Sequence, residues 1–140
     1  MYLLDTNVIS ELRKGAHADA VVRAWAENAP ANSFWLSTIT VLELEIGVLR
    51  IERRDAAQGA LLRQWLENWV LSRFSERTLD VDVAIARRCA SLHVPDPRPE
   101  RDALIAATAL THGLTMVTRN LVDFEPMGVA LINPWQASSA

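Results

Sequence analysis

The sequence predicts an α/β fold in which a mostly parallel sheet of four or five strands is covered by helices on both faces. Two observations carry this prediction: short apolar runs alternate with stretches of helical periodicity, and polar turn residues close each run. No internal repeat or linker divides the chain, and 140 residues suit one domain with a substantial core. We expect a single domain over residues 1–135 and a short polar tail over residues 136–140.

In the first half of the chain, apolar runs at Tyr2–Leu4 and Phe34–Leu36 predict two buried strands. Polar residues after each run favour a helix start, because Asp5 to Asn7 precede apolar residues at helical spacing and Ser37 can cap the next helix. The last two helices of this half follow one another directly and predict a helical hairpin. Helices are expected over residues 8–12, 18–27, 39–54 and 55–71.

The second half of the chain continues the alternation. Val94–Pro99 carries three prolines, so this segment cannot be helical, and Gly113 ends the helix that follows it. A turn over Thr118 to Asn120 is expected after the fourth strand. Strands are expected over residues 78–81, 114–117 and 129–132, and helices over residues 83–92 and 101–111.

Composition excludes several classes of protein. The formal net charge of −3 argues against a polyanion partner, unless several acids gather in one site and leave the remaining surface weakly basic. The single cysteine, Cys89, rules out a disulfide framework and favours a reducing cytoplasm. Asp5 follows the first apolar run at once, and the longest uncharged runs fall short of about 20 apolar residues, so we expect no signal peptide and no membrane span.

Acidic residues follow the strands that should end at one edge of the sheet. Asp5 closes the first strand, Asn120 and Asp123 follow the fourth, and Asp102 stands at a helix start. Ligands of open parallel sheets bind beyond the carboxyl ends of the strands, so these segments should point toward one rim. Each acid alone also has an ordinary role: Asp5 as a helix cap, Asp102 at a helix N-terminus and Asp123 as a turn residue.

A fourth acid comes from the helix expected over residues 39–54, where Glu43 and Glu45 compete for the inward position. Residues two apart on a helix differ by about 200° of rotation, so the two cannot line the same pocket. Glu43 shares an apolar face with Ile39, and Gly47 leaves room one turn on, whereas Glu45 points toward Glu52 and the wetter side. We choose Glu43, which has no Lys or Arg three or four residues away to pair with it.

Carboxylates that converge at one rim repel one another and would take up protons at neutral pH unless a divalent cation neutralised them. Oxygen ligands select Mg²⁺ or Mn²⁺ over zinc, and such an ion can activate water and stabilise charge during phosphodiester hydrolysis. The sequence therefore predicts metal-assisted cleavage of RNA or DNA. It contains no glycine-rich phosphate loop, no Gly-x-Ser-x-Gly elbow and no paired-histidine motif that would indicate another chemistry.

Four segments, taken in order, carry a resemblance that covers nearly the whole chain. They are Leu3-Leu4-Asp5-Thr6-Asn7-Val8-Ile9-Ser10, Ser37-Thr38-Ile39-Thr40-Val41-Leu42-Glu43-Leu44 with Gly47, Asp102-Ala103-Leu104-Ile105-Ala106-Ala107-Thr108-Ala109, and Val117-Thr118-Arg119-Asn120 running to Asp123-Phe124, with Asn133-Pro134-Trp135 at the close. With these segments the chain resembles the PIN-domain ribonucleases of the VapC toxin type, and within them the FitB-like branch. The resemblance implies a PIN-like three-layer α/β/α sandwich.

The resemblance also implies a function. It implies the toxin of a type II toxin–antitoxin system, an endoribonuclease dependent on Mg²⁺ (Mn²⁺ can substitute). Asp5 and Asp102 would hold the metal, Glu43 would bind it or orient water, and Thr6 would position these groups. The implied partners are an RNA substrate, a cognate VapB-type antitoxin whose C-terminal segment covers the site, a second copy in a homodimer, and a hetero-oligomer with the antitoxin on operator DNA. We also expect Arg119 and Arg13 to meet phosphates near the rim.

One position departs from the family pattern. The family often has an acid where Asn120 stands, so the fourth acidic role can pass to Asp123, with Asn120 positioning a water or a backbone group. The number of metal ions stays open for the same reason. Two other functions remain as alternatives: a non-catalytic module whose acidic pocket receives an Arg-bearing partner peptide, and a phosphoacceptor of receiver type. The second lacks an acidic pair beside Asp5, and Lys14 is the only lysine.

Overall fold

The computed structural model describes residues 1–136, so the predicted polar tail lies outside the described residues except for Gln136. Five strands form one sheet in the order β3-β2-β1-β4-β5, and every neighbouring pair is parallel. The predicted parallel sheet is confirmed, with five strands. Their bounds are β1 Tyr2–Leu4, β2 Phe34–Ser37, β3 Thr78–Leu79, β4 Thr115–Val117 and β5 Leu131–Ile132.

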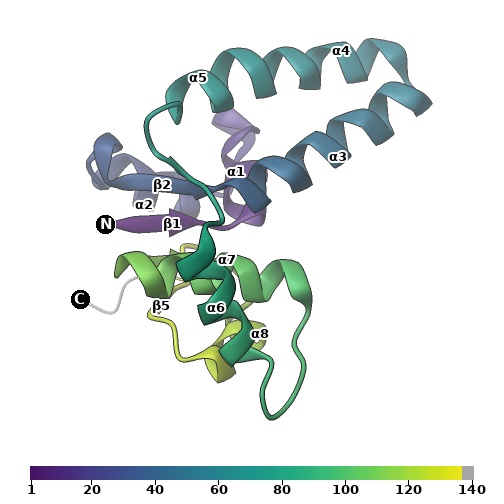
Figure 1. Ribbon diagram of the computed structural model, residues 1–140. Helices are drawn as coiled ribbons and strands as arrows, with labels where there is room; N and C mark the ends of the chain where they lie inside the picture. The colour runs from purple at the N-terminus through teal and green to yellow at the C-terminus, as the bar shows by residue number, and fades with distance from the viewer. Residues whose placement is uncertain (137–140) are drawn as a thin grey trace.

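Helices cover both faces of the sheet, which confirms the three-layer arrangement. In Figure 1, α6, α7 and α8 lie below β1 and β2 and beside β5, and the hairpin of α3 and α4 lies above β1 and β2. Short 3₁₀ turns are found at Gly15–His17, Ala31–Ser33 and Glu125–Met127. The helices are α1 Thr6–Leu12, α2 Ala20–Asn28, α3 Thr38–Arg54, α4 Ala56–Trp65, α5 Leu71–Arg73, α6 Val83–Leu92, α7 Glu100–His112 and α8 Leu121–Phe124.

Successive side chains of β1 point to opposite faces of the sheet, so its buried residues contribute to two separate cores. Leu4 packs on the face covered by α1 and α3, in one cluster with Ile9 and Leu44. Leu3 points the other way, into a cluster with Ile105 of α7 and Phe124 of α8. Both β1 leucines are almost fully buried, so the central strand is fixed from both sides. The residue after Leu4 therefore has a well-defined position at the edge of the sheet.

Five segments differ from the sequence prediction. The helix expected over residues 55–71 is interrupted by a π-helical turn at Leu66–Val70, which keeps both of these residues fully buried, and the helix then continues to Arg73. α8 was not predicted, because four residues are too few to show helical periodicity. β3 and β5 contain two residues each, fewer than expected. α2 begins at Ala20 because the Asp19 side chain accepts hydrogen bonds from the first turn.

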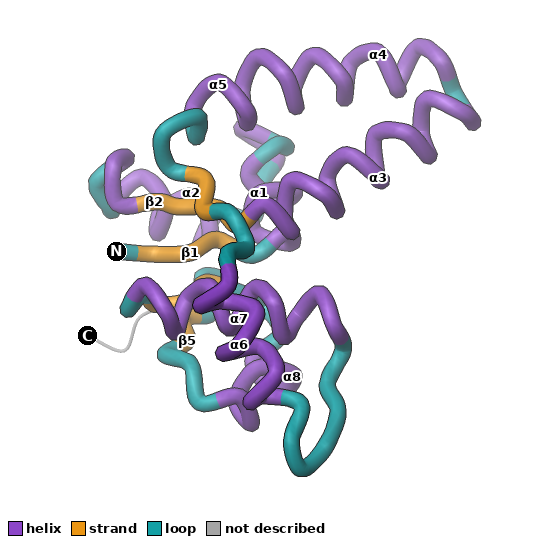
Figure 2. The backbone as a smooth tube through the Cα atoms, in the orientation of Figure 1, coloured by secondary structure: helices purple, strands orange, loops and turns teal. Residues whose placement is uncertain are grey.

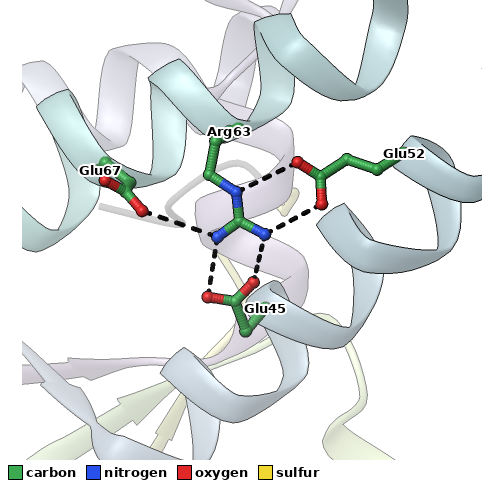
Figure 3. Close-up of polar contacts among 4 residues, drawn as sticks. All are labelled: Glu45, Glu52, Arg63 and Glu67. Carbon is green, nitrogen blue, oxygen red and sulfur yellow. Dashed lines mark hydrogen bonds and ion pairs between the residues drawn. The ribbon is translucent and has the colours of Figure 1, made fainter. Parts of the chain in front are cut away.

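The α3–α4 hairpin extends away from the sheet, as Figure 2 shows, and ion pairs link its two helices. Arg63 of α4 lies 2.6 Å from a carboxylate oxygen of Glu45 and 3.1 Å from one of Glu52, both on α3 (Figure 3). Glu67 adds a longer contact of 3.7 Å. The prediction that Glu45 faces Glu52 rather than the site is thus confirmed. Among residues 1–136, no helix has the length and apolar character needed to cross a membrane.

We predict that Gly59→Ala destabilises the hairpin. A Cβ on Gly59 would lie 2.5 Å from the Cα of Glu52, so α3 and α4 would have to separate. The expected loss is about 1–3 kcal/mol of unfolding free energy, measured by urea denaturation. Gly47→Ala is the matched control, because nothing lies within 4 Å of a Cβ there. This control should be neutral or stabilising by about 0.5–1 kcal/mol, and equal losses in the two variants would contradict the prediction.

Candidate active site

The carboxyl ends of β1 and β4 meet at one edge of the sheet. Leu4 of β1 is in register with Val117 of β4, and the next residue of each segment is polar: Asp5 and Thr118. The backbone N–H of Asp5 donates to the Val117 carbonyl at 2.9 Å, so the pairing of the strands fixes the position of Asp5 directly. Asp5 also caps α1, the ordinary role that the sequence allowed for it.

Asp5 is a buried carboxylate held by several donors. Its Oδ1 accepts a hydrogen bond from the Thr6 backbone N–H at 2.8 Å, and its Oδ2 accepts one from the Thr118 hydroxyl at 2.8 Å. The Asn7 amide adds a longer contact of 3.4 Å to Oδ2. Burial and, to a smaller extent, the charges of Asp102 and Glu43 together raise the pKa of Asp5 from 3.8 to about 6, although the hydrogen bonds from Thr118 and Thr6 lower it.

Glu43 lies on the first turns of α3 and reaches the same edge. Its Oε1 accepts a hydrogen bond from the Thr6 hydroxyl at 2.6 Å, so Thr6 connects Asp5 to Glu43. Its Oε2 lies 3.9 Å from a guanidinium nitrogen of Arg101. The missing cationic partner of Glu43 therefore comes from α7, far away in the sequence, and it is held only loosely.

Asp102 completes the coupled set from the first turn of α7, a helix whose next residue, Ala103, is fully buried. Burial raises the pKa of Asp102, and the charges of Glu43 and Asp123 raise it further. Asp123 itself is exposed on α8. The four carboxylates predicted from the sequence thus influence one another electrostatically, although they come from four separate segments.

Asn120 and Thr118 organise the fourth segment. The Asn120 backbone N–H donates to the Thr118 hydroxyl oxygen at 3.0 Å, while the same hydroxyl donates to Asp5. The sequence predicts Thr118 only as a turn residue and predicts no role for the side chains of Asn7 and Arg101. The position of Thr118 directly after β4, like that of Asp5 after β1, is the signal that could have identified it.

Each of the two arginines expected at the rim lies over a tryptophan ring. The Arg119 guanidinium lies 5.0 Å from the ring centre of Trp135, and the Arg119 backbone N–H donates to the Asn7 side chain at 3.4 Å, which places Arg119 beside the site. Arg13 lies 5.9 Å from the ring centre of Trp65 on α4. Of these two arginines, Arg119 is the one that hydrogen-bonds Asn7, whose side chain contacts Asp5.

The donor set suits a hard cation in an open site. Within residues 1–136, no three Asp, Glu, His or Cys side chains stand close enough together to enclose an ion. The facing ligands are carboxylate oxygens, and the pKa values of Asp5 and Asp102 are raised, as expected of carboxylates that lack a neutralising charge. Mg²⁺ usually keeps several waters and takes only one or two carboxylates, so these residues fit such an ion without a closed cage.

Comparisons with known proteins agree with this geometry. A family profile described as the PIN domain matches residues 2–125. The chain is 36% identical to the VapC ribonuclease Y4jK of Sinorhizobium fredii, over 97% of this chain and 99% of that protein. It is 37% identical to toxin FitB of Neisseria gonorrhoeae, over 96% of this chain and 99% of FitB.

A solved structure supports the fold. A FitAB complex bound to an IR36 DNA fragment contains a chain that superposes with a TM-score of 0.89 at 32% identity, covering 99% of this chain and 98% of that one. The predicted resemblance to VapC-type proteins and to the FitB-like branch is therefore confirmed.

We predict that Asp5→Asn stabilises the protein at pH 7.5 in EDTA. The folded protein holds the Asp5 proton up to about pH 6, whereas the unfolded chain releases it near pH 3.8. The free energy of unfolding therefore falls as the pH rises through this window, by up to about 3 kcal/mol. Asn cannot ionise, so the variant should melt above wild type at pH 7.5 and near it at pH 4.

The matched control for this experiment is Asp80→Asn, which changes an exposed aspartate. Thermal unfolding of all three proteins is followed by circular dichroism at both pH values. A difference between wild type and Asp5→Asn that does not change with pH would contradict the prediction.

Proposed function

The chain belongs to the PIN-domain family, and on this basis we propose that it is the toxin of a type II toxin–antitoxin system, an endoribonuclease that hydrolyses RNA phosphodiester bonds. The observation that carries the proposal is the junction at the carboxyl edge of the sheet, where Thr6 links Asp5 to Glu43 and Arg101, the residue before Asp102, lies 3.9 Å from Glu43. Helix capping alone would give no reason for acids from separate segments to meet at this edge.

Nucleases of the VapC type are generally metal-dependent, and we assign Mg²⁺ to this site, with Mn²⁺ as a substitute. Asp5 and Asp102 would hold the ion. When bound, such an ion lowers the pKa of water and offsets negative charge on the phosphate. Asp123, which stands near Asp102, takes the fourth acidic role in place of Asn120. A second metal ion would need Asp123 as a ligand.

The chain's own residues prepare the reaction. Glu43 Oε1 is occupied by the Thr6 hydroxyl, which leaves Oε2 to accept a proton from the attacking water. Thr118 and Thr6 keep the Asp5 carboxylate in one orientation, because each supplies one hydrogen bond to a different oxygen. Asn120 is fixed through its backbone to Thr118 and can position water or a phosphate group from there.

A groove on the face of the sheet covered by α1 and α2 fits the proposed antitoxin. It has a volume of about 800 Å³ and runs between α1, α2 and the α4–α5 segment. Its lining is mostly apolar, and cationic side chains stand among the lining residues, a combination that suits an amphipathic segment with acidic residues. The lining includes Leu12, Ala26, Phe34 and Trp69, with Arg23 and Arg73.

The remaining partners follow from the surface and from the family. Leu42 and Leu49 of α3 lie seven residues apart on one face of the helix and are 46% and 54% exposed, so they suit burial against a second copy in a homodimer. A complex with the antitoxin would bind operator DNA, as the FitAB complex binds its DNA fragment. The buried free thiol of Cys89 fits the reducing cytoplasm as the place of action.

We predict that Asp102→Asn abolishes Mg²⁺-dependent RNA cleavage, with at least about a hundredfold loss of kcat/KM, because an uncharged amide is a weaker ligand for the ion. Glu100→Gln is the matched control, since it removes an acid from the same turn of α7. RNA cleavage and growth arrest on expression are measured for both, with circular dichroism to check the fold. Full activity in Asp102→Asn would remove Asp102 from the proposed site, whereas the absence of cleavage and growth arrest with wild type would favour the alternative of a non-catalytic module that receives an Arg-bearing peptide.

We predict that Ala26→Lys weakens inhibition by the antitoxin and leaves RNA cleavage intact. Ala26 lines the groove on α2, so a lysine there obstructs the antitoxin but stands away from the carboxylates. RNA cleavage should stay within about twofold of wild type, while inhibition by the antitoxin weakens at least about tenfold. Ala24→Lys, exposed on the same helix, should leave both properties unchanged. Normal inhibition of Ala26→Lys, measured by titrating antitoxin into the cleavage assay, would remove the groove from the proposal.

A further inference from the structure

We propose that Arg101 binds a phosphate of the RNA strand at the active site, and that its contact with Glu43 is the resting position of this phosphate-binding group. The inference rests on the proposed nuclease function and adds a substrate-binding residue to it. Arg101 lies in the first turn of α7, directly before Asp102. Figure 1 shows that α3 begins where β2 ends, and the contact between Glu43 and Arg101 brings the first turns of α3 and α7 together at this edge.

Charge is the first argument. A site with four carboxylates repels the polyanion that it must bind, and a cationic side chain beside them would add to the proposed metal ion in offsetting this repulsion. Among the described residues, Arg101 forms the one ion pair that involves any of the four acids. Its guanidinium is therefore the positive group that the structure places closest to the reacting region.

The looseness of the contact is the second argument. The shortest distance between the Arg101 guanidinium and Glu43 is 3.9 Å, which is too long for a hydrogen bond. The Arg101 side chain is 52% exposed, and exposed pairs of this kind contribute little to stability. Arg101 can thus exchange Glu43 for a phosphate at small cost, and the planar guanidinium then forms two parallel hydrogen bonds with phosphate oxygens.

Other arginines near the catalytic face are already engaged. Arg119 and Arg13 are held over tryptophan rings, and Arg63 is shared among three glutamates of the hairpin. By contrast, Arg101 has only its loose carboxylate partner. The first turn of α7 has no side-chain cap at Pro99, and the positive end of the helix dipole adds to the attraction for an anion. We therefore assign phosphate contact to Arg101 and not to these other arginines.

The test measures RNA binding separately from cleavage. A short fluorescein-labelled oligoribonucleotide of mixed sequence is titrated with protein in Ca²⁺ in place of Mg²⁺, at several salt concentrations, and Kd is read from anisotropy. Arg101→Ala should bind roughly tenfold more weakly. The slope of log Kd against log salt should fall by about 0.7, the contribution of one phosphate contact to a single strand. Arg101→Lys should keep the slope and recover part of the affinity, because it keeps the charge but loses the paired hydrogen bonds.

The control is Arg54→Ala, which removes the same charge from the far end of α3. It should leave both Kd and the slope close to wild type. If Arg101→Ala lowers kcat for cleavage but matches Arg54→Ala in Kd and slope, Arg101 only orients Glu43 and the inference is wrong. The absence of measurable RNA binding by wild type would also overturn it. Failure of wild type to cleave RNA in Mg²⁺ would instead remove the nuclease proposal, whatever the binding data show.

Discussion

The structure depends on one constraint: a carboxylate that must remain available for chemistry is buried at the end of the central strand. Asp5 receives hydrogen bonds from Thr6 and Thr118, but these do not cancel the effects of burial and of the neighbouring acids on its pKa. The protein tolerates this unfavourable burial because Leu3 and Leu4 of β1, both almost fully buried, pack into the cores on the two faces of the sheet. Two independent cores therefore hold in place a group that works against folding.

In the rest of the site, too, the residues that position the functional groups differ from those that stabilise the fold. Thr6 donates to Asp5 through its backbone N–H and to Glu43 through its hydroxyl, while the Thr118 hydroxyl donates to Asp5 and accepts from the Asn120 N–H, so two threonines connect three segments. The Thr118 hydroxyl suits this task because it can donate and accept at once. The α3–α4 hairpin, which carries Glu43 at its base, is stiffened separately by Arg63. Positioning and rigidity thus come from different residues, and either can change without removing the other.

Much of this arrangement could be predicted from the sequence, because the relevant signals are local. The strand before Asp5, the helix rotation that separates Glu43 from Glu45, and the glycine that ends α7 each depend on neighbours within a few residues. The missed features depend on distant partners. Arg101 meets Glu43 only because α3 and α7 begin at the same edge, and the π-helical turn at Leu66–Val70 forms because both residues find space in the core. Periodicity cannot reveal either of these.

The hydrogen bond between Thr118 and Asp5 joins residues 113 positions apart, and Asp102 also enters late in the chain. During translation the ribosome releases Asp5 first, and the nascent polypeptide lacks the groups that orient it until β4 has emerged. A partly made chain therefore cannot assemble the catalytic edge. A cell that synthesises this protein is therefore exposed to its activity only after nearly the whole chain has been completed.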